Sequence, residues 1–226
     1  MIKAMILAAG EGRRMRPLTL TTPKPLLKVG EHALIEHTIH RLANSGIQEI
    51  VVNVAYLGHQ IIKALGDGSR YGVKLSFSHE PEPLETGGAI NEALNLLGDK
   101  PIVLINADVW SDIDLDPLIK NAKVSAAMQL VMVENPAHNP EGDYGIEQNR
   151  LIFKQTNKPS YTYAGIGLLN PIAFAEYPER REKFPLKEWI DFNIERHNVL
   201  AHIHRGYWCD VGTPERLEEL NNTENK

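Results

Sequence analysis

The first half of the chain alternates short, wholly apolar runs with segments whose apolar residues recur every three or four positions. Continuous apolar runs are typical of strands buried on both faces, and the longer repeat is typical of amphipathic helices. We therefore predict strands at 4–9, 49–55, 74–78 and 101–108, separated by helices at 32–44, 59–65 and 86–97. This order predicts a parallel sheet covered by helices on both faces.

The pattern changes after about residue 125. Apolar runs at 126–133, 146–154 and 161–169 follow one another without long helices, which indicates antiparallel strands added to the sheet. Helices at 172–177 and 186–197, a strand at 200–204 and a helix beginning at Pro214 complete the prediction. No segment has the composition of a linker, so we predict one domain over residues 1–226, an α/β fold with a mixed, mostly parallel sheet.

Composition limits the possible partners. The 24 basic and 29 acidic residues give a net charge of −5, which argues against a nucleic-acid partner, and one cysteine excludes an internal disulfide. No apolar run approaches the ~18 residues of a membrane helix, and the basic residues near the N-terminus follow the first apolar run instead of preceding it as in a signal peptide. We expect a cytoplasmic protein without a membrane partner, as a monomer or weak homodimer.

The first candidate site follows the strand at 4–9, where the chain reads Gly10-Glu11-Gly12 and then carries Arg13, Arg14 and Arg16. Glycines let backbone N–H groups approach phosphate oxygens, and arginines supply the matching charge. The third glycine of the dinucleotide fingerprint and the Gly-Lys-Ser/Thr of a Walker A loop are both missing. Downstream, Pro23 and Pro25 enclose Lys24, which predicts a lysine held in a stiff extended segment.

Two aspartates lie where oxygen ligands for Mg²⁺ could converge. Asp108 ends the strand at 101–108, at the sheet edge where α/β proteins bind ligands, and Asp210 lies in a turn before the last helix. A helix cap or a structural turn is the alternative for each of them. We interpret Asp112 and Asp114 as caps of a helix from about residue 115, and His138 as a solvated loop histidine.

Together these pieces resemble the signature of the sugar-1-phosphate nucleotidyltransferases. The resemblance begins with LAAGEGRRMRPLT (residues 7–19) and PKPL, and continues through EPEPLETGG (80–88), NADVW (106–110) and WCDVGT (208–213). It implies a Rossmann-like fold, that of the nucleotide-diphospho-sugar transferases. It also implies an Mg²⁺-dependent enzyme that joins a nucleoside triphosphate to a sugar 1-phosphate.

The resemblance also implies roles for individual residues. Arg16 would contact the β- and γ-phosphates, Lys24 the α-phosphate, and Asp108 and Asp210 would hold Mg²⁺, with Arg16, Lys24 and Asp108 as the catalytic residues. The nucleotide would contact Ala9, Gly10, Glu11, Gly12, Arg13, Lys24, Glu85 and Gly87. The sugar phosphate would contact Asn106, Asp143 and the backbone of Gly145.

Within this family, the segment Leu84-Glu85-Thr86-Gly87-Gly88 and the loop at 135–144 resemble the uridylyltransferases that act on N-acetylmuramate α-1-phosphate in cell-wall recycling. This implies UTP as the nucleotide. Other nucleotide and sugar pairs, such as GTP with a heptose 1-phosphate or CTP or dTTP with a hexose 1-phosphate, remain open. A catalytically silent nucleotide-binding module is a further alternative. The Glu-Lys-Pro triplet of glucose-type relatives is absent, and Asn157-Lys158-Pro159 leaves open whether a second catalytic lysine exists.

Overall fold

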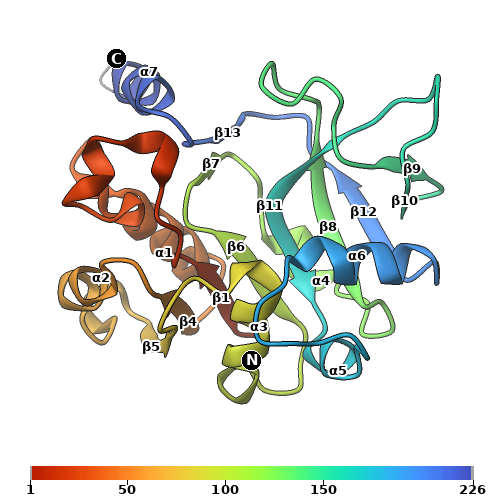
Figure 1. Ribbon diagram of the computed structural model, residues 1–226, viewed down its shortest axis with the longest axis horizontal. Coiled ribbons are helices and arrows are strands. Elements are labelled where there is room, and N and C mark those ends of the chain that lie inside the picture. Colours follow the sequence, from red (N-terminus) through yellow and green to blue (C-terminus); the bar gives the residue numbers. More distant parts are fainter. Residues whose placement is uncertain (1, 225–226) are drawn as a thin grey trace.

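The computed structural model describes residues 2–224, which fold around a nine-stranded mixed sheet with the strand order β5-β4-β1-β6-β11-β8-β12-β10-β9 (Figure 1). The strands β5, β4, β1 and β6 are parallel, and β11 pairs antiparallel with both β6 and β8. The strands are β1 (Ala4–Leu7), β4 (Glu49–Val54), β5 (Lys74–His79), β6 (Ile102–Asn106), β8 (Met128–Val133), β9 (Gly145–Glu147), β10 (Arg150–Ile152), β11 (Thr162–Leu169) and β12 (Val199–Ile203).

Helices cover both faces of this sheet, as predicted. Ala4 and Ile6 of β1 point into one apolar cluster and Met5 into the other, because successive strand residues face opposite sides. The first cluster includes residues of α1 (Leu34–Asn44), α2 (Gly58–Leu65) and α4 (Asp116–Lys120). The second includes residues of α3 (Glu85–Leu97), α5 (Pro171–Ala175) and α6 (Leu186–Ile194).

Two small ribbons and the last helix lie beside the main sheet. The strand β2 (Lys28–Val29) pairs with β3 (His32–Ala33), and β7 (Val109–Ser111) pairs with β13 (Trp208–Asp210). The helix α7 (Pro214–Glu224) begins at Pro214, as predicted. Leu217 and Leu220 of this helix pack with Met15 and Val211, so α7 ties the arginine-rich turn to the end of β13.

Several local predictions differ from the structure. The predicted strand at 146–154 is a hairpin, because Gln148 and Asn149 both have positive φ, 50° and 60°, and turn the chain between β9 and β10. The helix predicted from residue 32 begins at Leu34, since the two residues before it form β3. Asp114 accepts the Asp116 N–H at 2.9 Å as a cap would, whereas Asp112 pairs with His204 instead.

Within residues 2–224, none of the helices combines the length and the apolar character needed to cross a bilayer.

Candidate active site

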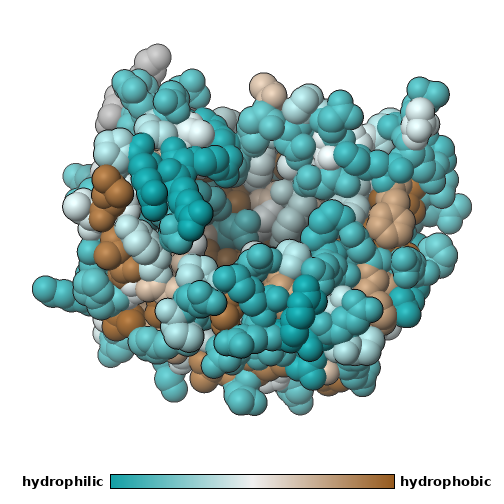
Figure 2. Space-filling view, viewed as in Figure 1, coloured by the Kyte–Doolittle hydropathy of each residue, from teal (hydrophilic) through white to brown (hydrophobic). Residues whose placement is uncertain are grey.

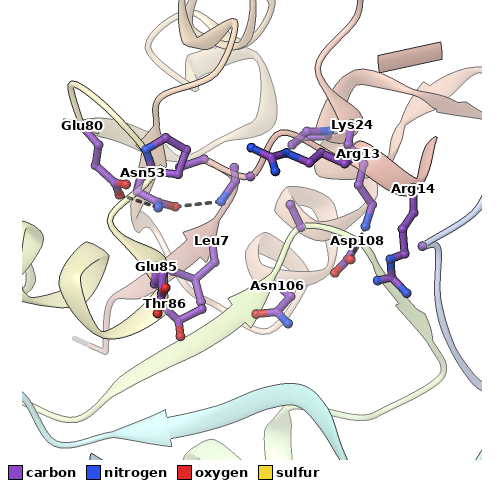
Figure 3. Close-up of a pocket in the computed structure, with 18 residues that line it drawn as sticks. Leu7, Arg13, Arg14, Lys24, Asn53, Glu80, Glu85, Thr86, Asn106 and Asp108 are labelled. Atoms are coloured by element: carbon purple, nitrogen blue, oxygen red, sulfur yellow. Dashed lines mark hydrogen bonds and ion pairs between the residues drawn. The ribbon is translucent and has the colours of Figure 1, made fainter. Parts of the chain in front are cut away.

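The carboxyl ends of β1, β4 and β6 form the floor of the first cavity, which has a volume of about 410 Å³ (Figure 3). Leu7, Asn53 and Asn106 line it where these strands end. The loop that follows β1 forms one wall, and in Figure 2 the surface is hollowed near the centre of the view. A parallel sheet brings these strand ends to one edge, so the site sits where the sequence predicted it.

A buried polar link fixes the wall beside this loop. The Ala8 N–H donates to Asn53 Oδ1 at 2.7 Å, and Asn53 Nδ2 donates to Glu80 Oε1 at 2.7 Å. Glu80 also accepts the Leu84 N–H at 3.0 Å, and burial raises the pKa of its carboxyl group. The link joins the ends of β1 and β4 to the segment before α3, which holds the cavity in shape.

The arginine-rich turn presents its side chains unequally. Gly12 has φ 61°, a left-handed conformation that favours glycine, and a 3₁₀ turn follows at Arg13–Met15. Arg13 and Arg14 line the cavity, whereas Arg16 does not. Arg16 Nη2 lies 3.4 Å from Glu11 Oε2, and Glu11 also accepts from Arg13 at 2.7 Å. Among the residues described, Arg14 forms no ion pair, so its charge is available to an anion in the cavity.

The aspartates predicted to bind a metal are brought together by the β7–β13 ribbon. Asp210 pairs with Val109, and the Val211 N–H donates to the Asp108 carbonyl at 2.8 Å. Asp108 forms an ion pair with Lys24, whose side chain is 14% exposed. Pro23 and Leu27 are extended, as predicted for this segment, but Lys24 itself begins a 3₁₀ turn at Lys24–Leu26.

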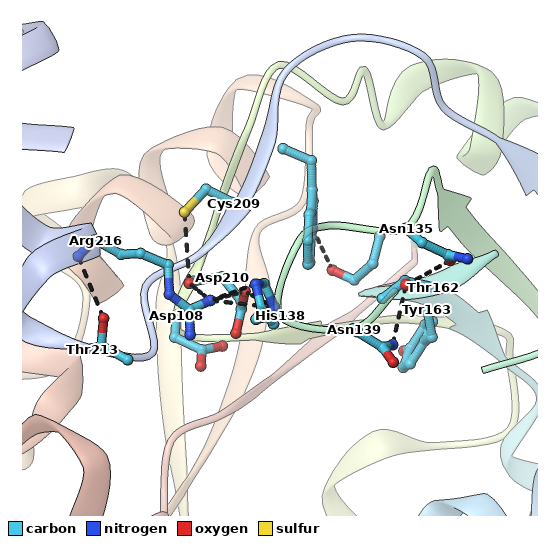
Figure 4. A network of polar contacts seen from close by, with 12 residues as sticks. Asp108, Asn135, His138, Asn139, Thr162, Tyr163, Cys209, Asp210, Thr213 and Arg216 are labelled. Atoms are coloured by element: carbon cyan, nitrogen blue, oxygen red, sulfur yellow. Dashed lines mark hydrogen bonds and ion pairs between the residues drawn. The ribbon is translucent and has the colours of Figure 1, made fainter. Parts of the chain in front are cut away.

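Asp210 is surrounded by its own polar partners (Figure 4). Arg216 of α7 pairs with its carboxylate and donates to its carbonyl at 2.8 Å. His138 is exposed in its loop, as predicted, but its Nε2 lies 3.0 Å from Asp210 Oδ1, a partner that the sequence did not indicate. Cys209 is half-buried, and burial raises the pKa of its thiol, which keeps it protonated and weakly nucleophilic at neutral pH.

A second cavity of about 500 Å³ adjoins the first, and Leu7, Thr86 and Asn106 line both. Its other lining residues come from the loop before β9, the segment after β10, β11, and α6 with the residue before it: Gly142, Asp143, Tyr144, Phe153, Lys154, Tyr163, Pro185, Leu186, Lys187 and Ile190. The two cavities form one cleft with room for two joined or reacting ligands.

The comparisons with known proteins agree with this geometry. The family model described as "Nucleotidyl transferase" matches residues 3–226. The chain belongs to this family. It is 44% identical over 225 residues to the N-acetylmuramate alpha-1-phosphate uridylyltransferase of Neisseria meningitidis serogroup B, covering 96% of each protein.

Other relatives of this nucleotidyl transferase differ in length. It is 33% identical to the mannose-1-phosphate guanyltransferase of Debaryomyces hansenii, over 94% of this chain but only 62% of that protein. A solved structure from Bacillus anthracis, provisionally named a glucose-1-phosphate thymidylyltransferase, matches with a TM-score of 0.87 at 22% identity, covering 99% of this chain and 95% of that one. That likeness confirms the predicted fold.

The cleft of this nucleotidyl transferase gathers many of the residues predicted from the sequence. Those lining the first cavity are Ala9, Gly10, Gly12, Arg13, Lys24, Glu85, Asn106 and Asp108, and Asp143 lines the second. Glu11, Arg16, Gly87, Gly145 and Asp210 line neither cavity, although Asp210 lies next to Asp108 across the ribbon.

The N–H groups of Gly87 and its neighbour Gly88 are used in packing within the protein. The N–H groups of Gly87 and Gly88 donate to the Phe184 carbonyl at 2.9 and 3.1 Å. A Cβ on Gly87 would lie 2.5 Å from the Phe184 ring, and one on Gly88 would lie 2.2 Å from the Glu182 carbonyl oxygen. These glycines therefore allow α3 to pack closely against the segment before α6 and leave no free N–H for a base. Gly145 similarly pairs with Ile152 in the β9–β10 hairpin.

The donor set at Asp108 and Asp210 fits Mg²⁺ held jointly with a nucleotide. Among the described residues, no cluster of three or more His, Cys, Asp or Glu side chains could hold a metal on its own. Mg²⁺ is commonly held by one or two carboxylates together with substrate phosphates and water. A Cβ on Gly212 would lie 3.1 Å from Asp210 Oδ2 and 3.2 Å from Arg14 Nη2, so glycine keeps the space between them open.

Three polar residues in or beside the cleft were not singled out by the sequence reasoning. Arg14 was part of the arginine run, but its neighbours were assigned the phosphate contacts. Arg216 lies in the first turn of the last helix and contacts Asp210, and Lys154 lies two residues after β10. A pattern of Gly-x-Gly followed two residues later by arginine could have favoured Arg14, because the 3₁₀ turn makes adjacent side chains point in different directions.

Proposed function

We propose that this nucleotidyltransferase transfers a uridylyl group from UTP to N-acetylmuramate α-1-phosphate, forming UDP-N-acetylmuramate and pyrophosphate. The observation that carries the proposal is the 44% identity, over 96% of both chains, to a protein named for this reaction. The composite cleft supports it, since one cavity is bordered by phosphate-binding groups and the adjoining cavity offers room for a sugar. We further place the enzyme in the cytoplasm, within peptidoglycan recycling.

In this reaction an oxygen of the sugar phosphate attacks the α-phosphorus of UTP. A new P–O bond forms, and the bond to the β-phosphate bridging oxygen breaks, so its electron pair leaves with pyrophosphate. The attacking oxygen is already an anion at neutral pH, so a general base is unnecessary. The barrier lies in bringing two anions together, and catalysis consists of positioning and charge neutralisation.

The residues of the first cavity are suited to that work. Arg13 and Arg14, which line the cavity, would bind the β- and γ-phosphates, a role that the resemblance assigned to Arg16. Lys24 would neutralise the α-phosphate, because it is held at the cavity wall by Asp108. Asp108 and Asp210 would hold Mg²⁺, which supplies additional positive charge to the triphosphate.

The test is a pyrophosphate-release assay with UTP, GTP, CTP and dTTP, each combined with N-acetylmuramate 1-phosphate, N-acetylglucosamine 1-phosphate and mannose 1-phosphate. We expect the highest kcat/KM for UTP with N-acetylmuramate 1-phosphate, and loss of turnover when EDTA removes Mg²⁺. A higher kcat/KM for another pair would replace the proposed substrates. Tight UTP binding without turnover of any pair would indicate a silent binding module.

A further inference from the structure

The second cavity contains a lysine that no acidic side chain neutralises. Lys154 Nζ donates to the carbonyl oxygens of Gly142 at 3.0 Å and Glu141 at 3.4 Å, and it forms no ion pair within residues 2–224. By contrast, Lys187, the other lysine of this cavity, pairs with Asp191 at 2.5 Å. An ammonium group carries three N–H donors, so Lys154 retains a donor and its full positive charge.

The acidic side chain that lines this cavity already has hydrogen-bond donors of its own. Asp143 lines the same cavity, but Asn139 Nδ2 donates to its Oδ1 at 3.0 Å and the Tyr163 N–H donates to its Oδ2 at 2.8 Å. These bonds fix the Asp143 carboxylate against the loop and the end of β11. Lys154 is therefore free to attract an anion from the ligand.

Apolar side chains lie in the lining beside this lysine. Phe153 precedes it, lines the same cavity and is 44% exposed. Pro185, Leu186 and Ile190 contribute further apolar surface. The lining thus combines an unpaired cation with a patch that would contact methyl groups.

This combination matches one feature of the proposed sugar. N-acetylmuramate differs from N-acetylglucosamine by a lactyl ether on O3, which adds a methyl group and a carboxylate. A carboxylate is the expected partner for an unpaired ammonium group, because charge-assisted hydrogen bonds are the strong ones. The methyl group would reduce the exposed apolar surface.

We propose that Lys154 is a specificity residue that pairs with the carboxylate of the sugar's acidic ether, so that the enzyme selects sugar 1-phosphates bearing an acidic substituent over their neutral analogues. This inference rests on the proposed function and deepens it. It assigns the choice of sugar to the second cavity, beside the β9–β10 hairpin, and not to the arginine-rich turn after β1.

The test compares two sugars in the variant Lys154→Met, which keeps the length and apolar stem of the side chain. With saturating UTP, we expect kcat/KM for N-acetylmuramate 1-phosphate to fall roughly 10- to 100-fold, mainly through KM, as for a lost charge-assisted hydrogen bond. The inhibition constant of N-acetylglucosamine 1-phosphate should change by less than about threefold, because that sugar has no carboxylate to lose. Melting temperatures verify that the variant is folded.

The matched control is Lys183→Met. Lys183 lies before α6 and lines neither cavity, with its Nζ 3.6 Å from Glu82, so neither constant should change. Equal weakening of both sugars by Lys154→Met would place Lys154 on the shared phosphate and overturn the inference, as would no effect on either. The proposed function fails separately, if the unmodified enzyme does not use N-acetylmuramate 1-phosphate.

Discussion

Gly10 offers a direct test of how closely the nucleotide approaches the loop after β1. It lines the first cavity, its φ is not positive, and a Cβ built on it meets no atom within 4 Å. The variant Gly10→Ala therefore places one methyl group in the cavity without disturbing the folded protein. Any loss of activity would therefore come from contact between the added methyl group and the bound nucleotide.

The effects on stability and binding should have opposite signs. Alanine restricts the unfolded chain more than glycine, so stability should rise by about 0.4–1 kcal/mol, or roughly 1–4 °C in Tm. A phosphate oxygen that accepts a backbone N–H must lie about 2.9 Å from the nitrogen, close to the added methyl group. Losing one charge-assisted hydrogen bond costs about 1.5–3 kcal/mol, which predicts a roughly 10- to 150-fold fall in kcat/KM for UTP.

The measurement is pyrophosphate release with UTP varied at saturating sugar phosphate, alongside thermal unfolding. The KM for the sugar phosphate serves as an internal control and should not change, since Gly10 does not line the second cavity. If Gly10→Ala is folded, with a Tm no lower than that of the unmodified enzyme, and its kcat/KM for UTP stays within about twofold, the nucleotide does not contact this backbone and the phosphate-loop interpretation is refuted.

Four further predictions follow from single contacts. Arg14→Gln should lower kcat/KM for UTP at least about tenfold and Arg16→Gln less than about threefold, because only the first side chain lines the cavity; equal losses in steady-state kinetics would contradict this. Asp210→Asn should abolish most turnover and raise the Mg²⁺ concentration for half-maximal rate, and an unchanged Mg²⁺ titration would remove it from the metal site. Gly88→Ala should lower the free energy of unfolding in urea by about 1–3 kcal/mol, because its Cβ would lie 2.2 Å from the Glu182 carbonyl oxygen. An unchanged urea midpoint would show that the segment around Glu182 moves to accommodate the methyl group. Tyr163→Phe should leave stability unchanged or raise it, because the buried hydroxyl has no partner; a loss above about 1 kcal/mol would reveal one.

The central strands were predictable because their residues are buried on both faces. Ile102, Val103, Leu104 and Ile105 alternate between the two apolar clusters, yet all are fully buried, which produces the continuous apolar run seen in the sequence. The glycine-arginine turn and the placement of Asp108 at the sheet edge were predictable for the same reason, since a buried strand fixes where its carboxyl end lies.

Pairings over long sequence separations were not predictable. The strands β7 and β13 are three residues each and lie about a hundred residues apart in the sequence. No local sequence pattern therefore predicts the ribbon that brings Asp108 and Asp210 together. The ion pair between Arg216 and Asp210 depends on where α7 packs. The close packing of Gly87 against Phe184 was likewise not predictable, because a glycine needed for helix packing looks the same in the sequence as one needed for a ligand.

The order of the chain separates the scaffold of the cleft from one of its acidic groups. All nine strands of the main sheet lie within residues 4–203, whereas Asp210, Gly212 and Arg216 come afterwards. The main sheet is therefore built without the second carboxylate, which depends on the β7–β13 ribbon and on the packing of α7 for its position. Local loosening of α7 would silence the enzyme while leaving the sheet intact.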